Sequence, residues 1–315
     1  MSAASTGVPR EPTGFVGLGN MGGRIAARIT GAGWPVIGHD PRPGRAAAAG
    51  AQPAAGLAEL AARCATILLS LPDSAAVEAV VEGEDGLLAH ARPGQTVVDL
   101  STSAPSSTVR LHRLLAERGV TLVDAAVTGG AAAAERGTLT VMAGGPDAVL
   151  AALDELFALF AAQVHVMGEV GAGHSAKLLN NFLNAVALAA TAEVMVAAAH
   201  AGLDQERLLA VLNAGSGVNF ATLHRFPHIV RGDYLEGGLS TDLMLKDVLL
   251  YLGHLRELGV PSLNSPGPLA SFGLAAQLGY GGLISNRVYD ALGDLAGAPT
   301  RRPTPRPTAR GETAT

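Results

Sequence analysis

One lysine and three asparagines share one face of a predicted helix, and their side chains are well suited to chemistry. The segment 171–190 reads GAGHSAKLLNNFLNAVALAA. Helical periodicity places four of its polar side chains within about 60° of one direction, namely Lys177, Asn180, Asn181 and Asn184. An amine can exchange a proton with a substrate, and a carboxamide can hold a polar substrate by hydrogen bonds. Because the rest of this helix is apolar and rich in alanine, we interpret the polar face as the wall of a site.

A glycine-rich loop near the N-terminus is the second candidate for chemistry. The segment 14–23, GFVGLGNMGG, contains a G-x-G-x-x-G pattern between a strand-like run and a predicted helix. In that context the glycines allow a tight turn, a close approach of backbone to pyrophosphate, and packing of helix on strand. The helix N-terminus then directs free N–H groups at the phosphates. The predicted cofactor-binding residues of this loop are Gly17, Leu18, Gly19, Asn20, Met21 and Gly22.

An acidic residue follows the loop at the distance that a dinucleotide site requires. Asp40 ends the next strand-like run, PVIGHD, 18 residues after Gly22. A carboxylate there accepts hydrogen bonds from ribose hydroxyls and repels a 2′-phosphate, which favours NAD. Arg42 and Arg45 come directly afterwards and could instead pair with the 2′-phosphate of NADP. We therefore expect NAD, with NADP as the open alternative, and regard glycines used only for helix packing as the weaker reading.

The order of strand-like and helical segments predicts the fold that positions these residues. Strand-like runs return after each helical pattern, as βαβ units do: TGFVGLG, WPVIGHD, ATILLSLPD, QTVVDLS, VTLVDAAV and LTVMAGG. From about Gly168 the pattern is almost wholly helical. We expect a Rossmann-like, doubly wound parallel sheet followed by an all-α domain. The expected boundaries are a flexible leader at 1–12, the dinucleotide-binding domain at 13–167, a helical substrate and oligomerisation domain at 168–295, and a disordered tail at 296–315.

Composition restricts the class of protein. The 315 residues have room for about two domains, and a hydrophobic content of 48% provides sizeable cores. A net charge of −5 argues against a nucleic-acid partner. The apolar stretch around 185–201 is broken by Thr191 and Glu193, and it falls short of the roughly 20 residues of a membrane span. The lone Cys64 and a start without an apolar signal core predict a cytoplasmic location.

Three predicted strand ends carry further candidate residues, because ligands of parallel sheets bind outside the carboxyl ends of strands. They are Leu71-Pro72, the segment 99–105 with the sequence DLSTSAP, and the segment 124–130 with the sequence DAAVTGG. Their hydroxyls and glycine N–H groups could hold a carboxylate or a carbonyl. Each of these segments taken alone is an ordinary turn.

All of these motifs in one order resemble the β-hydroxyacid dehydrogenase family. The family includes 3-hydroxyisobutyrate dehydrogenases, tartronate semialdehyde and succinic semialdehyde reductases and, more distantly, 6-phosphogluconate dehydrogenase. The motifs that carry the resemblance are GFVGLGNMG, LSLP, DLSTSAP, DAAVTGGAAAAERGTLTVMAGG, GAGHSAKLLNN and LMLKD. The resemblance extends from about Thr13 to Leu295. It implies NAD(P)-dependent oxidation of a small 3-hydroxy acid to its semialdehyde, or the reverse reduction, by a homodimer or homotetramer.

The resemblance also assigns roles to individual residues. It makes Lys177 the catalytic acid/base and places Asn181 against the substrate, one helical turn further along. Chemistry agrees independently, because alcohol oxidation requires removal of a proton and burial lowers the pKa of a lysine toward neutrality. The remaining matches are Leu71, Pro72, Thr102 and Lys246 at the cofactor, Ser101 beside them at the substrate, and Thr128, Gly129 and Gly130 at the substrate carboxylate.

Some features depart from the family pattern or favour other functions. Thr128 replaces a serine that is usual in the family, and Ala76 and Leu239 replace an asparagine and a phenylalanine that are common in it. Imine reduction on the same fold, or a non-catalytic NAD(P)-binding module, are the alternatives, and relatives of both kinds lack the lysine found at position 177. His224 and His228 are four residues apart, but Pro227 between them and the lack of a nearby carboxylate argue against a metal site.

Overall fold

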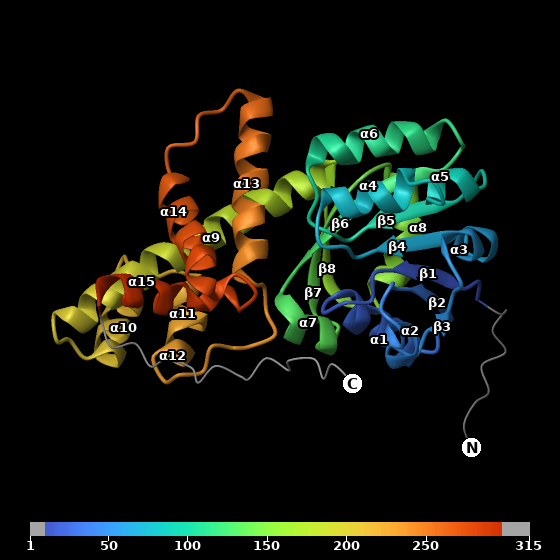
Figure 1. Ribbon diagram of the computed structural model, residues 1–315. Helices are drawn as coiled ribbons and strands as arrows, with labels where there is room; N and C mark the ends of the chain where they lie inside the picture. The colour runs from blue at the N-terminus through green and yellow to red at the C-terminus, as the bar shows by residue number, and fades with distance from the viewer. Residues whose placement is uncertain (1–9, 298–315) are drawn as a thin grey trace, which may run out of the picture.

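An α/β region and a helical region make up the chain (Figure 1). The computed structural model describes residues 10–297, and residues 1–9 and 298–315, which include most of the expected leader and tail, lie outside the described residues. The last strand of the sheet ends at Gly168, and the long helix α9 (Ala172–His200) begins four residues later. Helix α9 runs from the edge of the sheet into the helical region, so it belongs to the packing of both.

The sheet has eight strands in the order β3-β2-β1-β4-β5-β6-β7-β8. The strands up to β6 pair in parallel. Their order reverses between β1 and β4, and at such a point the connections after the two strands diverge and leave a crevice for ligands. The strand bounds are β1 Thr13–Val16, β2 Val36–His39, β3 Gln52–Pro53, β4 Thr66–Leu69, β5 Thr96–Asp99, β6 Thr121–Thr128, β7 Leu139–Gly144 and β8 Ala161–Gly168.

Alternate side chains of the strands enter two separate cores, which makes the sheet doubly wound as predicted. In β4, Leu68 packs in the core beneath α1, α7 and α8, whereas Ile67 and Leu69 pack in the core beneath α3, α4 and α6. This alternation is the two-residue period of a strand buried on both faces. The helices of this region are α1 Gly22–Gly31, α2 Arg45–Ala48, α3 Leu57–Arg63, α4 Ser74–Glu82, α5 Leu87–His90, α6 Pro105–Ala116, α7 Gly130–Arg136 and α8 Asp147–Phe157.

The far edge of the sheet differs from the expected all-parallel arrangement. Strand β7 runs antiparallel to β6, and β8 then pairs in parallel with β7. Only the segment 129–138 joins β6 to β7, which is shorter than the dozen or more residues that a parallel crossover needs. Strands β3 and β8 were not predicted. Strand β3 has two residues, and most of β8 is exposed at the edge, so neither has a buried apolar pattern.

The second region is helical, as expected. Its core joins the apolar half of α9 to α13, where Leu188 and Met195 pack in one cluster with Met244 and Val248. The line of α9 that begins with polar residues thus turns into core beyond Asn184. The elements are α10 Gln205–Ala214, α11 Phe220–His224, α12 Phe226–Ile229, α13 Thr241–Leu258, α14 Pro266–Ala275, a π-helical turn Ala276–Tyr280, a 3₁₀ turn Ser285–Arg287 and α15 Val288–Ala296.

Helix α9 is longer than the apolar run read from the sequence. Its 29 residues are long and apolar enough to cross a membrane by length and composition, so the argument that this segment is too short was wrong. Half of its most apolar window is buried inside the protein. A central helix in the core of a folded domain meets the same criterion, and the contacts of α9 with α13, α14 and α15 are of that kind.

Candidate active site

The glycine loop lies at the point where the strand order reverses. Gly17 has a φ of +86°, and a Cβ atom there would overlap the carbonyl oxygen of Ser70 at the end of β4. A Cβ atom at Gly22 would overlap the carbonyl oxygen of Gly17. At Gly19 a Cβ atom would meet only the tip of Arg42, at 3.3 Å. Two glycines are therefore fixed by close packing, and the third leaves backbone open to a ligand, as a pyrophosphate cradle requires.

Asp40 is held at the end of β2 by the loop and by a neighbouring arginine. Its carboxylate accepts hydrogen bonds from the N–H groups of Leu18 and Arg42, and it forms an ion pair with the Arg42 side chain at 3.1 Å. Burial favours the neutral acid, but these hydrogen bonds outweigh it and lower the pKa of Asp40 to about 2. The acid is thus ionised and able to accept hydrogen bonds, with Arg42 beside it, and the contact of Asp40 with the ribose of a cofactor stays a prediction.

The strand ends of β4 and β5 are tied together by one buried hydroxyl. The N–H of Leu71 donates to Ser101 Oγ at 2.9 Å, and Ser101 is 5% exposed. Asp99, also buried, accepts a hydrogen bond from the Ser101 N–H at 2.9 Å and one from Ser103 Oγ at 3.1 Å. In this structure Ser101 positions the cofactor-side loops, and its contact with substrate stays a prediction.

Lys246 connects the helical region to both of these loops. Its Nζ donates to the carbonyl oxygens of Pro72 at 3.0 Å and Thr102 at 3.1 Å. The same ammonium lies 2.9 Å from Asp247 Oδ1. A second contact joins the two regions, because Asn20 Nδ2 of the glycine loop donates to the Gly237 carbonyl at 2.6 Å. The glycine loop and the ends of β4 and β5 therefore contact α13 and the loop before it, and this junction is where we expect the cofactor cleft.

The start of α9 is anchored to the sheet by a buried acid. Asp124 of β6 is fully buried and accepts hydrogen bonds from the N–H groups of Gly171 at 2.6 Å and His174 at 2.7 Å. A carboxylate at this end also interacts favourably with the helix dipole. Gly171 has a φ of +95°, and a Cβ at Gly173 would overlap the Met142 carbonyl. The glycines of GAGHSAK thus let the helix approach the sheet closely.

His174 is a buried link between α9 and the cofactor-side loops. Its ring is fully buried, with Nδ1 at 2.7 Å from Thr108 Oγ1 and Nε2 at 3.8 Å from Asp99 Oδ2. The structure places His174 inside the first turn of α9, where it joins the start of the Lys177 helix to β5 and α6.

Lys177 follows on the face of α9 that carries Asn181, within the electrostatic influence of Asp247 and Lys246 of α13. Its side chain is half-buried, and loss of surrounding water lowers its pKa to about 8 from 10.5. The carboxylate of Asp247 opposes this change and the ammonium of Lys246 adds to it. An amine with a pKa near neutrality can both accept and return a proton, so Lys177 has the property that an acid/base group needs. Lys177 and Lys246 are the two lysines of the entire chain.

Asn181 is held by an acid that sequence analysis did not select. Its Nδ2 donates to Asp247 Oδ2 at 2.5 Å, and both side chains are buried. The carboxylate thereby fixes the orientation of the amide next to Lys177. Asn180, expected on the same face, is exposed instead and donates to Asn181 Oδ1 at 3.2 Å. The motif LMLKD could have pointed to Asp247, because it places an acid directly after Lys246, where it is available to orient a neighbouring side chain.

Thr128, Gly129 and Gly130 lie where β6 turns into α7. Thr128 is half-buried and the two glycines are exposed. Gly129 has a φ of +123° and Gly130 a φ of +74°, conformations that other residues rarely adopt. Exposed N–H groups at the start of a helix and an adjacent hydroxyl can hold a carboxylate. Their contact with substrate remains a prediction.

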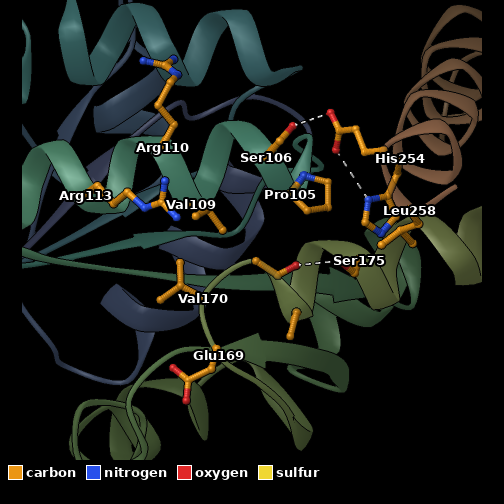
Figure 2. Close-up of a pocket in the computed structure, with 13 residues that line it drawn as sticks. Pro105, Ser106, Val109, Arg110, Arg113, Glu169, Val170, Ser175, His254 and Leu258 are labelled. Carbon is orange, nitrogen blue, oxygen red and sulfur yellow. Dashed lines mark hydrogen bonds and ion pairs between the residues drawn. The ribbon is translucent and has the colours of Figure 1, made fainter.

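A groove of about 460 Å³ lies elsewhere, between α6, the start of α9 and the end of α13 (Figure 2). Ser106 Oγ donates to Glu257 Oε1 at 2.9 Å across it, and Ser175 faces into it. Ser175 and Lys177 are two residues apart on one helix, so they point about 160° away from each other. The groove is therefore separate from the predicted site.

Comparison with protein families matches both parts of the chain. A family model described as the NAD binding domain of 6-phosphogluconate dehydrogenase matches residues 12–168. A second model, described as NAD-binding of NADP-dependent 3-hydroxyisobutyrate dehydrogenase, matches residues 171–271. The first match covers the sheet region and the second begins with the Lys177 helix.

Individual relatives match over most of their length. The chain is 35% identical to the L-threonate dehydrogenase of Cupriavidus necator, over 85% of this chain and 92% of that protein. It is 34% identical to the 2-(hydroxymethyl)glutarate dehydrogenase of Eubacterium barkeri, over 79% of this chain and 83% of that protein. The solved structure of Mycobacterium tuberculosis 3-hydroxyisobutyrate dehydrogenase with L-serine has a TM-score of 0.79 at 29% identity, covering 90% of this chain and 99% of that chain.

Proposed function

Because this chain belongs to the β-hydroxyacid dehydrogenase family, we propose that it oxidises a small 3-hydroxy acid to its semialdehyde, or catalyses the reverse reduction, with NAD(P). The observation that carries the proposal is Lys177, a half-buried amine with a pKa lowered to about 8, at the cleft that the glycine loop borders. The alternatives of imine reduction or a non-catalytic module do not account for a lysine in this state.

The residues of the cleft suit a nicotinamide dinucleotide. The backbone beside Gly19 is open, and the ionised Asp40 is placed for ribose hydroxyls. Pro72 and Thr102 are held by Lys246 on the opposite side of the crevice. The dinucleotide supplies a hydride acceptor for alcohol oxidation, or a hydride donor for the reverse reaction.

The side chains of the chain itself would handle the proton and the substrate. In oxidation the neutral Lys177 amine accepts the proton of the substrate hydroxyl, and in reduction the Lys177 ammonium returns it. Asp247 orients the Asn181 amide toward the same substrate. Thr128 Oγ1 and the N–H groups of Gly129 and Gly130 hold the carboxylate next to the reacting carbon. The cap from Asp124 keeps the α9 start, and hence Lys177, in a fixed position on the sheet.

We favour NAD over NADP as the physiological cofactor. A 2′-phosphate would have to displace Arg42 from its ion pair with Asp40 and would approach an ionised carboxylate. NAD requires only that Asp40 accept hydrogen bonds from ribose in addition to those it already accepts.

Turnover of a panel of hydroxy acids tests the proposed function. We would assay 3-hydroxyisobutyrate, L-threonate, L-serine and 2-(hydroxymethyl)glutarate with both cofactors and follow NAD(P)H absorbance. At least one acid should be oxidised by the natural protein and not by Lys177→Met. If the protein binds NAD(P) but oxidises none of these or related hydroxy acids, or reduces an apolar imine instead, the proposed function is wrong.

We also propose that the protein forms a homodimer or homotetramer in the cytoplasm. Large apolar side chains are exposed on the helical region, including Leu183 of α9 at 69% and Leu249 of α13 at 51%, which supports burial against a second copy. Burial of the lone Cys64 raises the pKa of its thiol to about 11, as suits an unreactive thiol in a reducing compartment. Size-exclusion chromatography with light scattering measures the assembly directly.

A further inference from the structure

Arg225 is a largely buried cation whose hydrogen bonds, within residues 10–297, go only to neutral amides. It lies between α11 and α12. Its Nη1 donates to Asn286 Oδ1 at 2.9 Å and its Nη2 donates to Asn184 Oδ1 at 3.0 Å. Burial lowers the pKa of Arg225 to about 10, and no carboxylate of the described chain counteracts that effect.

A second buried arginine of the helical region has counterions, as is usual for an arginine with a structural role. Arg287 is buried as well, but it pairs with Asp290 at 2.9 Å and with Glu236 at 3.0 Å. A buried charge without a counterion destabilises the folded state, so structural guanidinium groups are normally neutralised. Arg225 has five N–H donors and uses two of them on amide oxygens. Its charge and its remaining donors are available to an anion.

The position of Arg225 links it to the predicted site. Its partner Asn184 lies on the face of α9 that carries Lys177 and Asn181, seven residues beyond the lysine. This spacing is about 10 Å along the helix axis. The guanidinium also lies 5.8 Å from the ring of Phe220, which is 57% exposed. Arg225 is therefore close to solvent-accessible surface. It belongs to the helical region and lies near the part of α9 that follows Lys177.

We propose that Arg225, oriented by Asn184, binds a second carboxylate of the substrate, so that the preferred substrates are 3-hydroxy acids with two carboxylates. This inference rests on the proposed function and names its substrate class. The guanidinium fork matches a carboxylate in a bidentate arrangement, which favours this anion over a single-point contact. Thr128, Gly129 and Gly130 hold the carboxylate next to the reacting carbon, and Arg225 holds the one at the far end.

A set of three acids isolates the second carboxylate. 2-(Hydroxymethyl)glutarate has the second carboxylate on a two-carbon arm. In 2-(hydroxymethyl)glutaramate this far carboxylate is replaced by a neutral amide, so only the charge is lost. In 3-hydroxyisobutyrate a methyl group replaces the whole carboxylate-bearing arm. With the natural protein, we expect kcat/KM for the diacid to exceed that for the amide by about 30-fold or more, as for an unpaired buried charge. This comparison involves no substitution, so it does not depend on the folding of a variant.

Variants then assign the effect to Arg225. In Arg225→Gln, kcat/KM for the diacid should fall to about that for the amide, while 3-hydroxyisobutyrate turnover changes by less than about threefold. Arg225→Lys should recover part of the difference, because it keeps the charge but not the fork. The matched control is Arg231→Gln, since Arg231 is exposed and pairs with Glu206 at 2.9 Å. This control should behave as the natural protein does, and circular dichroism should show that all variants fold.

The outcomes separate this inference from the proposed function. Equal kcat/KM for diacid and amide in the natural protein, or equal losses for all three acids in Arg225→Gln, would overturn the second-carboxylate subsite while hydroxy-acid oxidation stands. If none of the acids is oxidised, the proposed function fails, and calorimetry with the NAD-loaded protein still decides the subsite. Binding of the diacid that Arg225→Gln abolishes supports it, and absence of binding refutes it.

Discussion

Replacing Lys177 with methionine removes an amine but keeps an unbranched side chain, and it should lower kcat for alcohol oxidation by about 10²–10⁴. The pKa of about 8 makes about a quarter of the Lys177 amines neutral at pH 7.5. A lysine with the pKa of 10.5 would be neutral in about one molecule in a thousand. Desolvation in the cleft thus increases the fraction of proton-accepting amine by about 200-fold.

The pH dependence follows from the same pKa. Below pH 8, kcat/KM for oxidation should rise about tenfold per pH unit, because each unit yields about ten times more neutral amine. Above pH 8 it should level off. The variant Lys177→Met should lose this limb, and Lys177→Arg should not restore it, because a guanidinium keeps its proton.

The pKa can also be measured without turnover. Because the chain has two lysines, selective ¹³C or ¹⁵N labelling of lysine gives NMR signals from Lys177 and Lys246 alone, and Lys177→Met assigns them.

The folded pKa of Lys177 lies below its unfolded value, so protonation destabilises the folded state. This effect is complete below pH 8 and disappears as the pH rises past 10.5. Lys177→Met should therefore raise Tm at pH 7 and less so near pH 10.

Two results would refute this reasoning. One is a Lys177 signal that titrates near 10.5, because the cleft would then not desolvate the amine. The other is Lys177→Met with near-normal turnover and the same rise of kcat/KM below pH 8, because another group would then accept the proton.

Three further predictions concern the cofactor, the substrate carboxylate and the start of α9. Asp40→Ala should narrow the kcat/KM preference for NAD, because it removes the ribose acceptor and frees Arg42 for a 2′-phosphate; a natural protein that prefers NADP tenfold would contradict this. Thr128→Val keeps the shape of the side chain, so it should raise KM for hydroxy acids about tenfold with little change in NAD affinity, and an unchanged KM would remove Thr128 from the carboxylate site. Asp124→Ala leaves two buried N–H groups without an acceptor and should lower the free energy of unfolding by about 3 kcal/mol or more, measured in urea. The exposed Asp147 in the first turn of α8 is the control, and a comparable loss in Asp147→Ala would show that the Asp124 cap is not special.

Short-range patterns in the sequence were sufficient to predict the glycine loop and the helix that carries Lys177. The three glycines and Asp40 lie on consecutive elements, and their roles depend on local turns that residue type restricts directly. The face of α9 with Lys177 and Asn181 follows from helical periodicity alone. Asn180, at the margin of the same face, became exposed because neighbouring elements, not periodicity, decide where the border of a face is covered.

The sequence by itself determined which elements form and which residue types stand at their ends, since periodicity, glycine conformation and strand alternation act within a few residues. Tertiary structure alone decided which distant groups meet. Asn181 pairs with Asp247 across 66 residues, Asp124 caps α9 across 47, and Arg225 reaches Asn184 across 41. Local spacing cannot specify such pairs, because each one depends on how whole helices and strands pack. The same packing removes water from around Lys177. The position of this amine on its helix could therefore be predicted from the sequence, whereas its lowered pKa depends on the tertiary structure around it.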